Sequence, residues 1–339
     1  MKETTLKQIA TELGISITTV SKALKNYPDV SESTKKAVKD LAIALHYTPN
    51  SFAVNLRTKE SKTIGLILPT VLHDFFSKVI DGILEEAEKR NYLVIILQSN
   101  EKYELEKKQI DLLLSKRVDG ILLSLSNETG EFHHLKTIFE HNTPLVLFDK
   151  IAKIVNCSKV SINDKKAAYD AVTYLIKKGY KKIAHFRGSY MPQNSIDRFL
   201  GYKKALEDHD INYDSSLVFV CDNNTDFEDG YENARKAIAE QPEIDAIFAV
   251  TDLVAIGAIK YFNERGIKIP QQIAIFGFSN WFMSSLITPK LSTIDQPGFE
   301  IGRTAAAILF DEIYSKKNNL PIVFQSIELE TSIIERQST

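Results

Sequence analysis

From residue 62 onward, short apolar runs alternate regularly with longer stretches whose apolar residues recur at helical spacing. A short run that is apolar on both faces predicts a buried strand, and regular alternation of strands and helices builds a parallel sheet with helices on both faces. We predict strands at Thr63–Leu68, Tyr92–Gln98, Gly120–Ser124, Pro144–Phe148, Lys182–Phe186, Leu217–Val220, Ala246–Val250 and Ile273–Phe276. We predict helices at Phe75–Lys89, Glu104–Ser115, Lys165–Lys178, Ile196–Glu207, Tyr231–Glu240, Val254–Arg265 and Phe299–Ser315.

This many strands predict two sheets, because a single open sheet of that length usually splits. We therefore expect an α/β body, residues 62–339, made of two doubly wound parallel-sheet lobes, with the break near Asn156–Asn163. The last helix and the run Ile322–Leu329 would return to complete one or both lobes. Doubly wound sheets bind ligands at the carboxyl ends of their strands, so two facing lobes predict a ligand-binding cleft.

The motifs of the commonest cofactor-dependent and hydrolytic enzymes are absent. The chain has no Gly-x-Gly pair, Walker motif, Gly-x-Ser-x-Gly elbow or His-Glu-x-x-His. Cys157 and Cys221 are too few and too far apart for a disulfide framework or a Cys-x-x-Cys clip. His133, His134 and His141 do not form a ligand set at metal-binding spacing. We expect no cofactor and no bound metal.

The chain also lacks a membrane-spanning stretch and an N-terminal secretion signal. No apolar run approaches the roughly 20 residues that a bilayer span needs. The start, Met1–Thr5, has no apolar core region and no cleavage site. Together with the sparse cysteines, these features predict a protein of the cytoplasm without a membrane partner.

Residues 1–49 show a different pattern, three short helices joined by tight turns. Leu6–Leu13 is amphipathic, and Gly14 can supply the left-handed turn that ends this helix. Ser16 is the expected N-cap of a second helix and Ser31 of a third. Two short helices joined by a glycine turn are typical of a helix-turn-helix, so we predict an all-α helix-turn-helix head.

An ordinary three-helix bundle is the alternative interpretation of this head, and the charge distribution argues against it. Residues 1–62 carry ten Lys and Arg against six Asp and Glu, whereas the remainder carries 32 against 38. A basic end on an acidic body is the pattern expected of a protein whose head approaches a polyanion.

Segments spread over nearly the whole chain match the pattern of one protein family. They are Leu6–Asn26, Val30–Thr34, His46–Thr58, Thr63–Pro69, Asp74–Phe76, Arg198–Tyr202, Thr251–Gly257, Gly277–Asn280 and Leu291–Pro297. They closely resemble the lac repressor/gal repressor (LacI/GalR) transcription factors, most specifically in the head. The resemblance implies a helix-turn-helix DNA-binding domain at residues 1–49 and a hinge helix and linker at 50–61. It implies a two-lobed effector-binding and dimerisation domain at 62–339, similar to periplasmic sugar-binding proteins.

In that family the second helix of the head enters the major groove of a pseudo-palindromic operator. The resemblance places Ile17, Thr18 and Lys22 at base edges; Lys22 stands where Arg is more frequent and lacks its planar fork. Contacts to the DNA backbone are implied for residues whose hydroxyls, amides or helix N-termini suit phosphate oxygens: Thr5, Ser16, Thr19, Ser21, Asn26, Ser31 and Thr34. For several of these, simple helix capping is the alternative.

Pro49–Arg57 predicts a short amphipathic helix that is too brief to hold in isolation. In the family this hinge folds on operator DNA, pairs with its twin and inserts a leucine into the minor groove. Leu56 occupies the leucine position, and Asn50 and Ala53 belong to the same minor-groove set. Packing of Leu56 inside the head is the less favoured alternative, because the flank that begins at Arg57 is hydrophilic.

The resemblance places an effector between the two lobes of the body. The implied contacts are Leu72, Phe75, Phe76, Asp149, Arg198, Thr251, Asp252, Ser279, Asn280 and Gln296. Arg198 is the family's main ligand arginine, and its fixed fork of donors suits vicinal hydroxyls or a carboxylate. A surface salt bridge is the alternative for Arg198.

Two further assignments leave an alternative open, and a third departs from the family's pattern. Phe75 and Phe76 suit either a ligand ring or the core, without preference, and Asp252 suits a helix cap better than a ligand. Ser279 and Asn280 stand where many members have an aspartate, so no carboxylate is available there to hold sugar hydroxyls.

Together these features predict a homodimeric transcriptional regulator, a repressor, whose operator affinity is controlled by a small molecule such as a sugar or sugar derivative. The apolar run Trp281–Ile287 lies in the neighbourhood through which the family dimerises. A non-regulatory sugar-binding protein is one alternative, and the missing secretion signal and the intact head count against it. An enzyme acting on a ligand in the cleft is the other, and turnover of a bound sugar would favour it.

Overall fold

The computed structural model describes residues 4–47, 60–71, 74–221 and 226–339. Its contacts divide the chain into two compact units, Met1–Ser61 and Lys62–Thr339.

The first unit contains the helix-turn-helix that the sequence predicts. Its helices are α1 (Leu6–Leu13), α2 (Ile17–Leu24) and α3 (Glu32–Ala44). Gly14 has a φ of 65° and ends α1, because its N–H bonds the last carbonyls of that helix. The three helices close around a small core that includes Ile9, Val20 and Val38.

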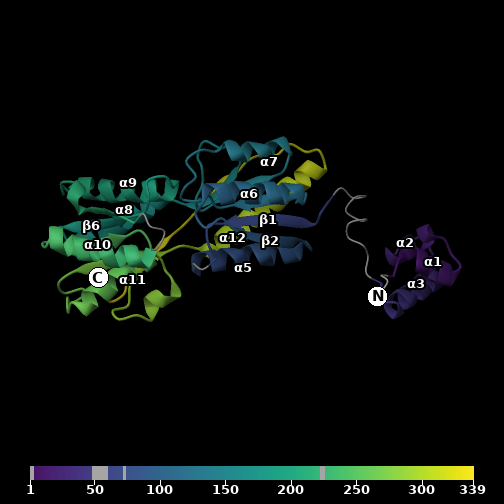
Figure 1. Ribbon diagram of the computed structural model, residues 1–339, viewed down its shortest axis with the longest axis horizontal. Helices are drawn as coiled ribbons and strands as arrows, with labels where there is room; N and C mark the ends of the chain where they lie inside the picture. Colours follow the sequence, from purple (N-terminus) through teal and green to yellow (C-terminus); the bar gives the residue numbers. More distant parts are fainter. Residues whose placement is uncertain (1–3, 48–59, 72–73, 222–225) are drawn as a thin grey trace. The chain divides into compact units, whose positions relative to one another are not determined.

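The first lobe of the second unit is a six-stranded sheet in which every neighbouring pair is parallel. Its order is β11-β5-β4-β3-β1-β2, with β1 (Thr63–Leu68), β2 (Leu93–Gln98), β3 (Gly120–Leu123), β4 (Leu145–Phe148), β5 (Ser158–Ile162) and β11 (Ser326–Leu329). Helices α5 (Asp74–Lys89) and α12 (Gly298–Lys317) pack together on one face (Figure 1). The other face carries α6 (Tyr103–Ser115), the short turn η1 (His133–Leu135) and α7 (Lys136–Glu140) (Figure 1).

The second lobe repeats this plan in the order β12-β10-β9-β8-β6-β7, with only β12 antiparallel to its neighbour among the described strands. Its strands are β6 (Ile183–Arg187), β7 (Val218–Val220), β8 (Ala246–Ala249), β9 (Ala274–Ser279), β10 (Ser292–Asp295) and β12 (Ser332–Ile334). Helices α8 (Asp164–Lys177) and α9 (Gln193–Asp208) pair on one face, and α10 (Asp226–Glu240) and α11 (Asp252–Glu264) on the other (Figure 1). Two 3₁₀ turns, η2 (Ser215–Leu217) and η3 (Phe282–Ser285), complete the lobe.

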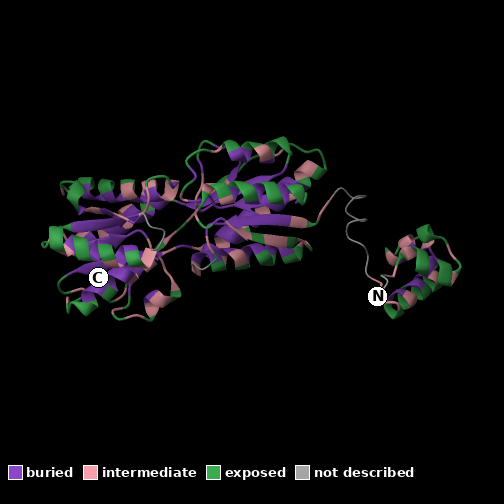
Figure 2. Ribbon diagram, viewed as in Figure 1, coloured by how far each residue is buried: buried purple, intermediate pink, exposed green. Residues whose placement is uncertain are grey.

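Buried residues concentrate in the central strands and on the helix faces that cover them (Figure 2). In each lobe the strand order reverses once, between β1 and β3 and between β6 and β8. Such reversals leave a crevice at the carboxyl ends of the strands, which is where doubly wound sheets bind ligands. The fold therefore places two potential binding edges in one unit.

The boundary between the lobes differs in detail from the sequence-based expectation. The predicted break, Asn156–Asn163, contains β5, which pairs with β4 and β11, so the chain leaves the first lobe only at Asn163. It returns between β10 and α12 at Gln296–Pro297, and crosses again between β11 and β12. The predicted final run, Ile322–Leu329, thus contains β11 of the first lobe, and β12 is added to the second lobe.

Four strands and one helix were not predicted as such. In β5 and β10, Ser and Thr residues interrupt the apolar run on which the strand prediction depended. These polar side chains are nevertheless satisfied: Ser292 in β10, for example, shares a hydrogen bond of 2.7 Å with the hydroxyl of Thr339. The edge strand β11 is similarly interrupted, by Ser326 and Glu328. The edge strand β12 has only three residues and α7 only five, too few for a period to show.

Candidate functional site

One face of α2 in the head is free of core contacts. Val20 and Ala23 are buried against α1 and α3, whereas Ile17 is 47% exposed and Thr18 is exposed as well. Lys22 is half-exposed and forms an ion pair with Asp29. The three residues predicted to read bases therefore share one accessible surface.

The residues predicted to contact the DNA backbone lie mainly at the helix N-termini of the head. Thr5, Ser16 and Ser31 are the N-caps of α1, α2 and α3, and each accepts a hydrogen bond from a backbone N–H three residues later. The hydroxyls of Thr19 and Thr34 each lie 2.8 Å from the cap hydroxyl of their own helix. The capping interpretation, left open by the sequence, thus holds for Thr5, Ser16 and Ser31.

Two other members of the backbone set lie outside these caps. Asn26 has a φ of 57° and accepts a hydrogen bond of 2.6 Å from Lys39 Nζ. Ser21 lies half-buried within α2. The predicted hinge residues Asn50, Ala53 and Leu56 lie outside the described residues, as does Leu72 in the body.

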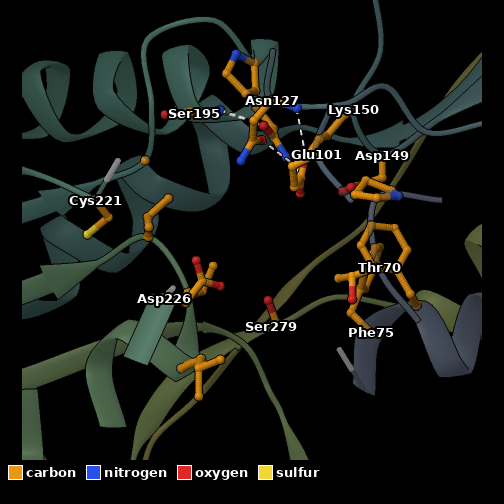
Figure 3. Close-up of a pocket in the computed structure, with 18 of the residues that line it drawn as sticks. Thr70, Phe75, Glu101, Asn127, Asp149, Lys150, Ser195, Cys221, Asp226 and Ser279 are labelled. Carbon is orange, nitrogen blue, oxygen red and sulfur yellow. Dashed lines mark hydrogen bonds and ion pairs between the residues drawn. The ribbon is translucent and has the colours of Figure 1, made fainter. Parts of the chain in front are cut away.

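In the body, a cavity of about 570 Å³ takes its lining from both lobes. The lining follows the carboxyl ends of the strands: Thr70 after β1, Glu101 after β2, Asn127 after β3, Asp149 after β4, Ser189 after β6, Thr251 after β8 and Gln296 after β10. Figure 3 shows Thr70, Phe75 and Asp149 on one side of this space and Cys221, Asp226 and Ser279 on the other. A volume of this size suits a small organic ligand.

Phe75 and Phe76 belong both to the core and to the cavity wall. They are 9% and 5% exposed, with ring centroids 5.2 Å apart in an edge-to-face arrangement, and they pack in the core cluster of α5 and α12. Both also line the cavity. The two alternatives that the sequence left open are therefore compatible.

Asp149 lies at the junction of the lobes, and its backbone conformation is unusual. Its φ is 56°, a region that non-glycine residues seldom occupy. The carboxyl is buried, and burial raises its pKa. Nearby, Lys150 Nζ lies 2.5 Å from Glu101 Oε1 and 2.6 Å from Asn127 Oδ1 (Figure 3).

Arg198 lines the cavity from α9, and its salt bridge is buried rather than on the surface. Its Nε donates to Asp164 Oδ1 at 2.8 Å, its Nη1 donates to the Val250 carbonyl at 2.7 Å, and its guanidinium lies 3.6 Å from the Phe278 ring centroid. Burial raises the pKa of Asp164 to about 7. Among the described residues none accepts a hydrogen bond from Arg198 Nη2, so this part of the guanidinium can donate to a ligand.

The helix-capping role expected for Asp252 belongs to Thr251 instead. Thr251 caps α11 through a hydrogen bond from the Val254 N–H, so Asp252 is not the cap. The Asp252 carboxylate instead accepts hydrogen bonds from Trp281 N, Ser284 Oγ and Thr293 Oγ1. Both residues line the cavity, but Asp252 is occupied in tying η3 and β10 to α11.

Of the pair Ser279–Asn280, only Ser279 lines the cavity. Ser279 Oγ donates to Gln296 Oε1 at 2.8 Å, which leaves Gln296 Nε2 buried without a partner among the described residues. The Asn280 amide is engaged elsewhere, donating to Asp295 and accepting from Arg336, each at 2.7 Å. The structure therefore does not bring Asn280 to the candidate site.

The sequence argument missed several lining residues, among them Glu101, Asn127, Lys150, Ser195 and Trp281. A signal for some of them existed, because Glu101, Asn127 and Lys150 follow predicted strands within a few residues, where a doubly wound sheet binds ligands. Ser195 and Trp281 carry no such mark, since one lies within a helix and the other in an apolar loop.

His134, considered above as a metal ligand, is instead 2.7 Å from Glu106 Oε1 in a buried pair. Within the described ranges, His, Cys, Asp and Glu side chains nowhere gather in threes to suit a metal ion. The described helices also include none with the length and apolar character of a membrane span.

Comparison with known proteins gives consistent matches for both units. Residues 5–50 match the model for "Bacterial regulatory proteins, lacI family", and residues 61–327 match "Periplasmic binding proteins and sugar binding domain of LacI family". The HTH-type transcriptional regulator RegA of Clostridium saccharobutylicum is 31% identical over 99% of both chains. Catabolite control protein A of Priestia megaterium is 32% identical over the same shares. The structure of the lac repressor dimer bound to operator and an anti-inducer matches with a TM-score of 0.86 at 21% identity, covering 99% of each chain.

Proposed function

The chain belongs to the LacI family of bacterial regulatory proteins, and from this membership we propose how it acts as a DNA-binding transcriptional regulator under small-molecule control. We propose a repressor that binds pseudo-palindromic operator DNA as a homodimer. The observation that carries this proposal is the presence, in one chain, of an exposed α2 face in the head and a cavity lined by both lobes of the body.

On the operator, α2 would lie in the major groove with Ile17, Thr18 and Lys22 at base edges. Phosphates would be held by the head's N-caps and the polar residues beside them: Thr5, Ser16, Thr19, Ser21, Asn26, Ser31 and Thr34. A capped helix N-terminus still presents N–H groups to an anion, so capping and phosphate contact are compatible. The hinge residues Asn50, Ala53 and Leu56 would enter the minor groove.

The effector would bind in the cavity between the lobes. Phe75, Phe76, Asp149, Arg198, Thr251, Ser279 and Gln296 would contact it, with Leu72 as a further candidate from the resemblance. Hydroxyls of a sugar or sugar derivative suit the free donors of Arg198 and the Gln296 amide. A ligand that touches both lobes favours one relative orientation of them, and thereby couples to DNA affinity.

The homodimer is supported by apolar side chains on the surface of the body. Phe282 and Leu286, in the predicted dimerisation run, are 56% and 66% exposed, and Leu93 on the edge strand β2 is 64% exposed. Exposed apolar residues of this size gather where a partner covers them.

We further propose that the protein binds its effector without chemical turnover, and that it works in the cytoplasm, where its DNA is. The relatives are transcriptional regulators, which supports both statements. Recovery of a chemically unchanged effector after prolonged incubation with the protein is the expected result.

A selection experiment tests the regulatory function. The full-length protein is incubated with a library of random duplexes, bound DNA is sequenced, and the enriched duplex is titrated by fluorescence anisotropy with and without a panel of sugars. We expect one symmetric sequence family to be enriched, with an affinity that at least one sugar changes. Enrichment of no sequence, or an affinity indifferent to every sugar, contradicts the proposal.

A further inference from the structure

Five charged side chains at the junction of the lobes carry one more carboxylate than cation. They are Glu101, Asp149, Asp164, Lys150 and Arg198, and their side chains or residues are all at least four-fifths buried. An uncompensated buried charge is costly, so this cluster gains stability by taking up one positive charge. Burial raises the pKa of Asp149, and that of Asp164 to about 7, so the cluster takes up a proton more readily than isolated aspartates do.

Both cations of the cluster are already engaged by carboxylates, whereas Asp149 is not engaged by a cation. Lys150 Nζ is 2.5 Å from Glu101, and Arg198 Nε is 2.8 Å from Asp164. In the part of the chain that the structure describes, the Asp149 carboxylate receives only a long hydrogen bond of 3.5 Å, from Ser124 Oγ. Asp149 lines the cavity and is thus the carboxylate that a ligand cation can reach.

Two buried polar groups in the same cavity call for hydroxyls rather than for a second charge. Ser195 and Gln296 are 5% and 4% exposed, and Ser195 Oγ and Gln296 Nε2 have no hydrogen-bond partner among the described residues. Because Gln296 Oε1 is occupied by Ser279, its Nε2 requires an acceptor. A ligand hydroxyl can accept from Gln296 and exchange a hydrogen bond with Ser195.

We propose that the effector is a hydroxylated small molecule that carries a protonated amine, as an amino sugar does, with the ammonium on Asp149 and hydroxyls on Ser195 and Gln296. The inference rests on the proposed function, because it assigns the chemical class of the ligand of the same cavity. It also excludes anionic effectors. Asp74, Asp226 and Glu228 add further carboxylates to the lining, while its described cations are limited to Lys150 and Arg198.

The chain contains a reporter for this test. Its single tryptophan, Trp281, lines the cavity, so intrinsic fluorescence follows occupancy. Full-length protein is titrated with three matched series: glucosamine, glucose and glucose 6-phosphate, and the corresponding galactose and mannose compounds. In at least one series we expect the amine to bind roughly tenfold more tightly than its parent hexose, the scale of a hydrogen bond to a charged group, and the phosphate to bind more weakly than both.

Calorimetry gives a second readout of the same idea. If the ammonium replaces the proton of the cluster, binding of the amine releases a proton, and the measured heat depends on the ionisation enthalpy of the buffer. The parent hexose leaves the proton in place, so its binding heat should be the same in two buffers that differ in ionisation enthalpy.

The decisive variant is Asp149→Asn, with Glu228→Gln as a control that removes an exposed carboxylate of the same cavity. Asp149→Asn should abolish the advantage of the amine over its parent and leave the affinity for the parent little changed, whereas Glu228→Gln should preserve the advantage. The inference is overturned if a hexose phosphate binds most tightly, if no amine of the panel binds, or if Asp149→Asn weakens amine and parent equally. Operator binding of the same preparation separates the two proposals. If a neutral or anionic effector changes the operator affinity, the proposed regulatory function stands and only the inference of an amine effector is wrong.

Discussion

At the scale of single residues, the cavity is marked by backbone conformations that most side chains avoid. Asp149 and Ser279 have φ values of 56° and 116°, and each ends or follows a strand whose carboxyl end faces the cavity. Such conformations persist where the surrounding structure holds them, and they gather at binding sites. The residue type alone gives no sign of them, because Asp and Ser are ordinary residues at the end of a strand.

Lys22 is the residue whose role is most open to direct measurement. In the free head it pairs with Asp29 at the surface, an interaction of small energetic value, so it is free to exchange this partner for a base. We expect Lys22→Ala to relax preference at one symmetric pair of operator positions by about 1–3 kcal/mol, measured across a library of half-site variants. Lys25→Ala, beside the end of the same helix, is the control. A loss uniform over all sequences would reassign Lys22 to the phosphate backbone.

We expect Glu312 to make the stability of the body depend on pH. It is 4% exposed in α12, it accepts a hydrogen bond of 2.5 Å from Ser158, and burial raises its pKa from 4.5 to about 7. The folded state therefore holds a proton that the unfolded state has lost between those two pH values, so Glu312 makes stability fall as pH rises from about 4.5 to about 7.

Glu312→Gln should remove that component, so that the variant gains stability over the parent at pH 8 and shows no such gain at pH 4. Urea denaturation at both pH values measures this difference. Glu300→Gln, a half-exposed position of the same helix, should leave the pH dependence as it is. Equal pH dependence in the Glu312 variant and the parent would contradict the assignment.

At the scale of elements, helix termini and helix crossings decide the local geometry. Ser16 fixes the start of α2, the helix proposed to read DNA, through a hydrogen bond of 3.0 Å from the Thr19 N–H. In the body, a Cβ at Gly82 or Gly302 would collide with the backbone of the partner helix, so glycine permits the close crossing of α5 and α12. That crossing covers one face of the first sheet.

Substitutions at Ser16 separate capping from phosphate contact. Ser16→Ala should destabilise the head by about 1 kcal/mol, the usual value of a lost N-cap, as measured by hydrogen exchange of the α2 amides in the full chain. Ser16→Asp keeps a capping oxygen but places a negative charge beside the phosphates, so it should preserve protection and weaken operator binding. If Ser16→Asp binds the operator as tightly as the parent, Ser16 is a cap alone.

At the scale of the whole molecule, the chain crosses repeatedly between the lobes, and Gln296 lies at one of these crossings and in the cavity. Residues that touch a ligand therefore also join the lobes. An effector that binds one relative orientation of the lobes better than the other therefore shifts the protein toward that orientation.

Arg198 should be essential to this coupling. Arg198→Ala should abolish the effect of the effector on operator affinity; for an inducer, ligand-independent DNA binding remains, and for a co-repressor, operator binding is lost at every effector concentration. Because the substitution also strips Asp164 of its partner, a cost of about 3–5 kcal/mol is expected for a broken buried pair. The double variant Arg198→Ala/Asp164→Asn should recover stability without recovering the response. A normal shift of operator affinity with effector in either variant would remove Arg198 from the site.

The sequence by itself determined the parts of this protein that depend on local patterns. Gly14 and Ser16 predicted the turn and the cap of the head, because a left-handed conformation and an N-cap hydrogen bond are properties of a few neighbouring residues. The apolar runs likewise predicted most strands of both lobes, since burial on both faces requires continuous apolar sequence.

Only the tertiary structure decided what long-range packing controls. It made Ser158–Ile162 a strand although it is partly polar, because β4 and β11 pair with it on either side. It drew Asn280 away from the cavity through Asp295 and Arg336, and it gathered Glu101, Lys150, Asp149, Asp164 and Arg198 into one charged cluster. Apart from the adjacent Asp149 and Lys150, those residues are well separated in the chain. The energy of a buried charge depends on its neighbours in space, which no local pattern encodes.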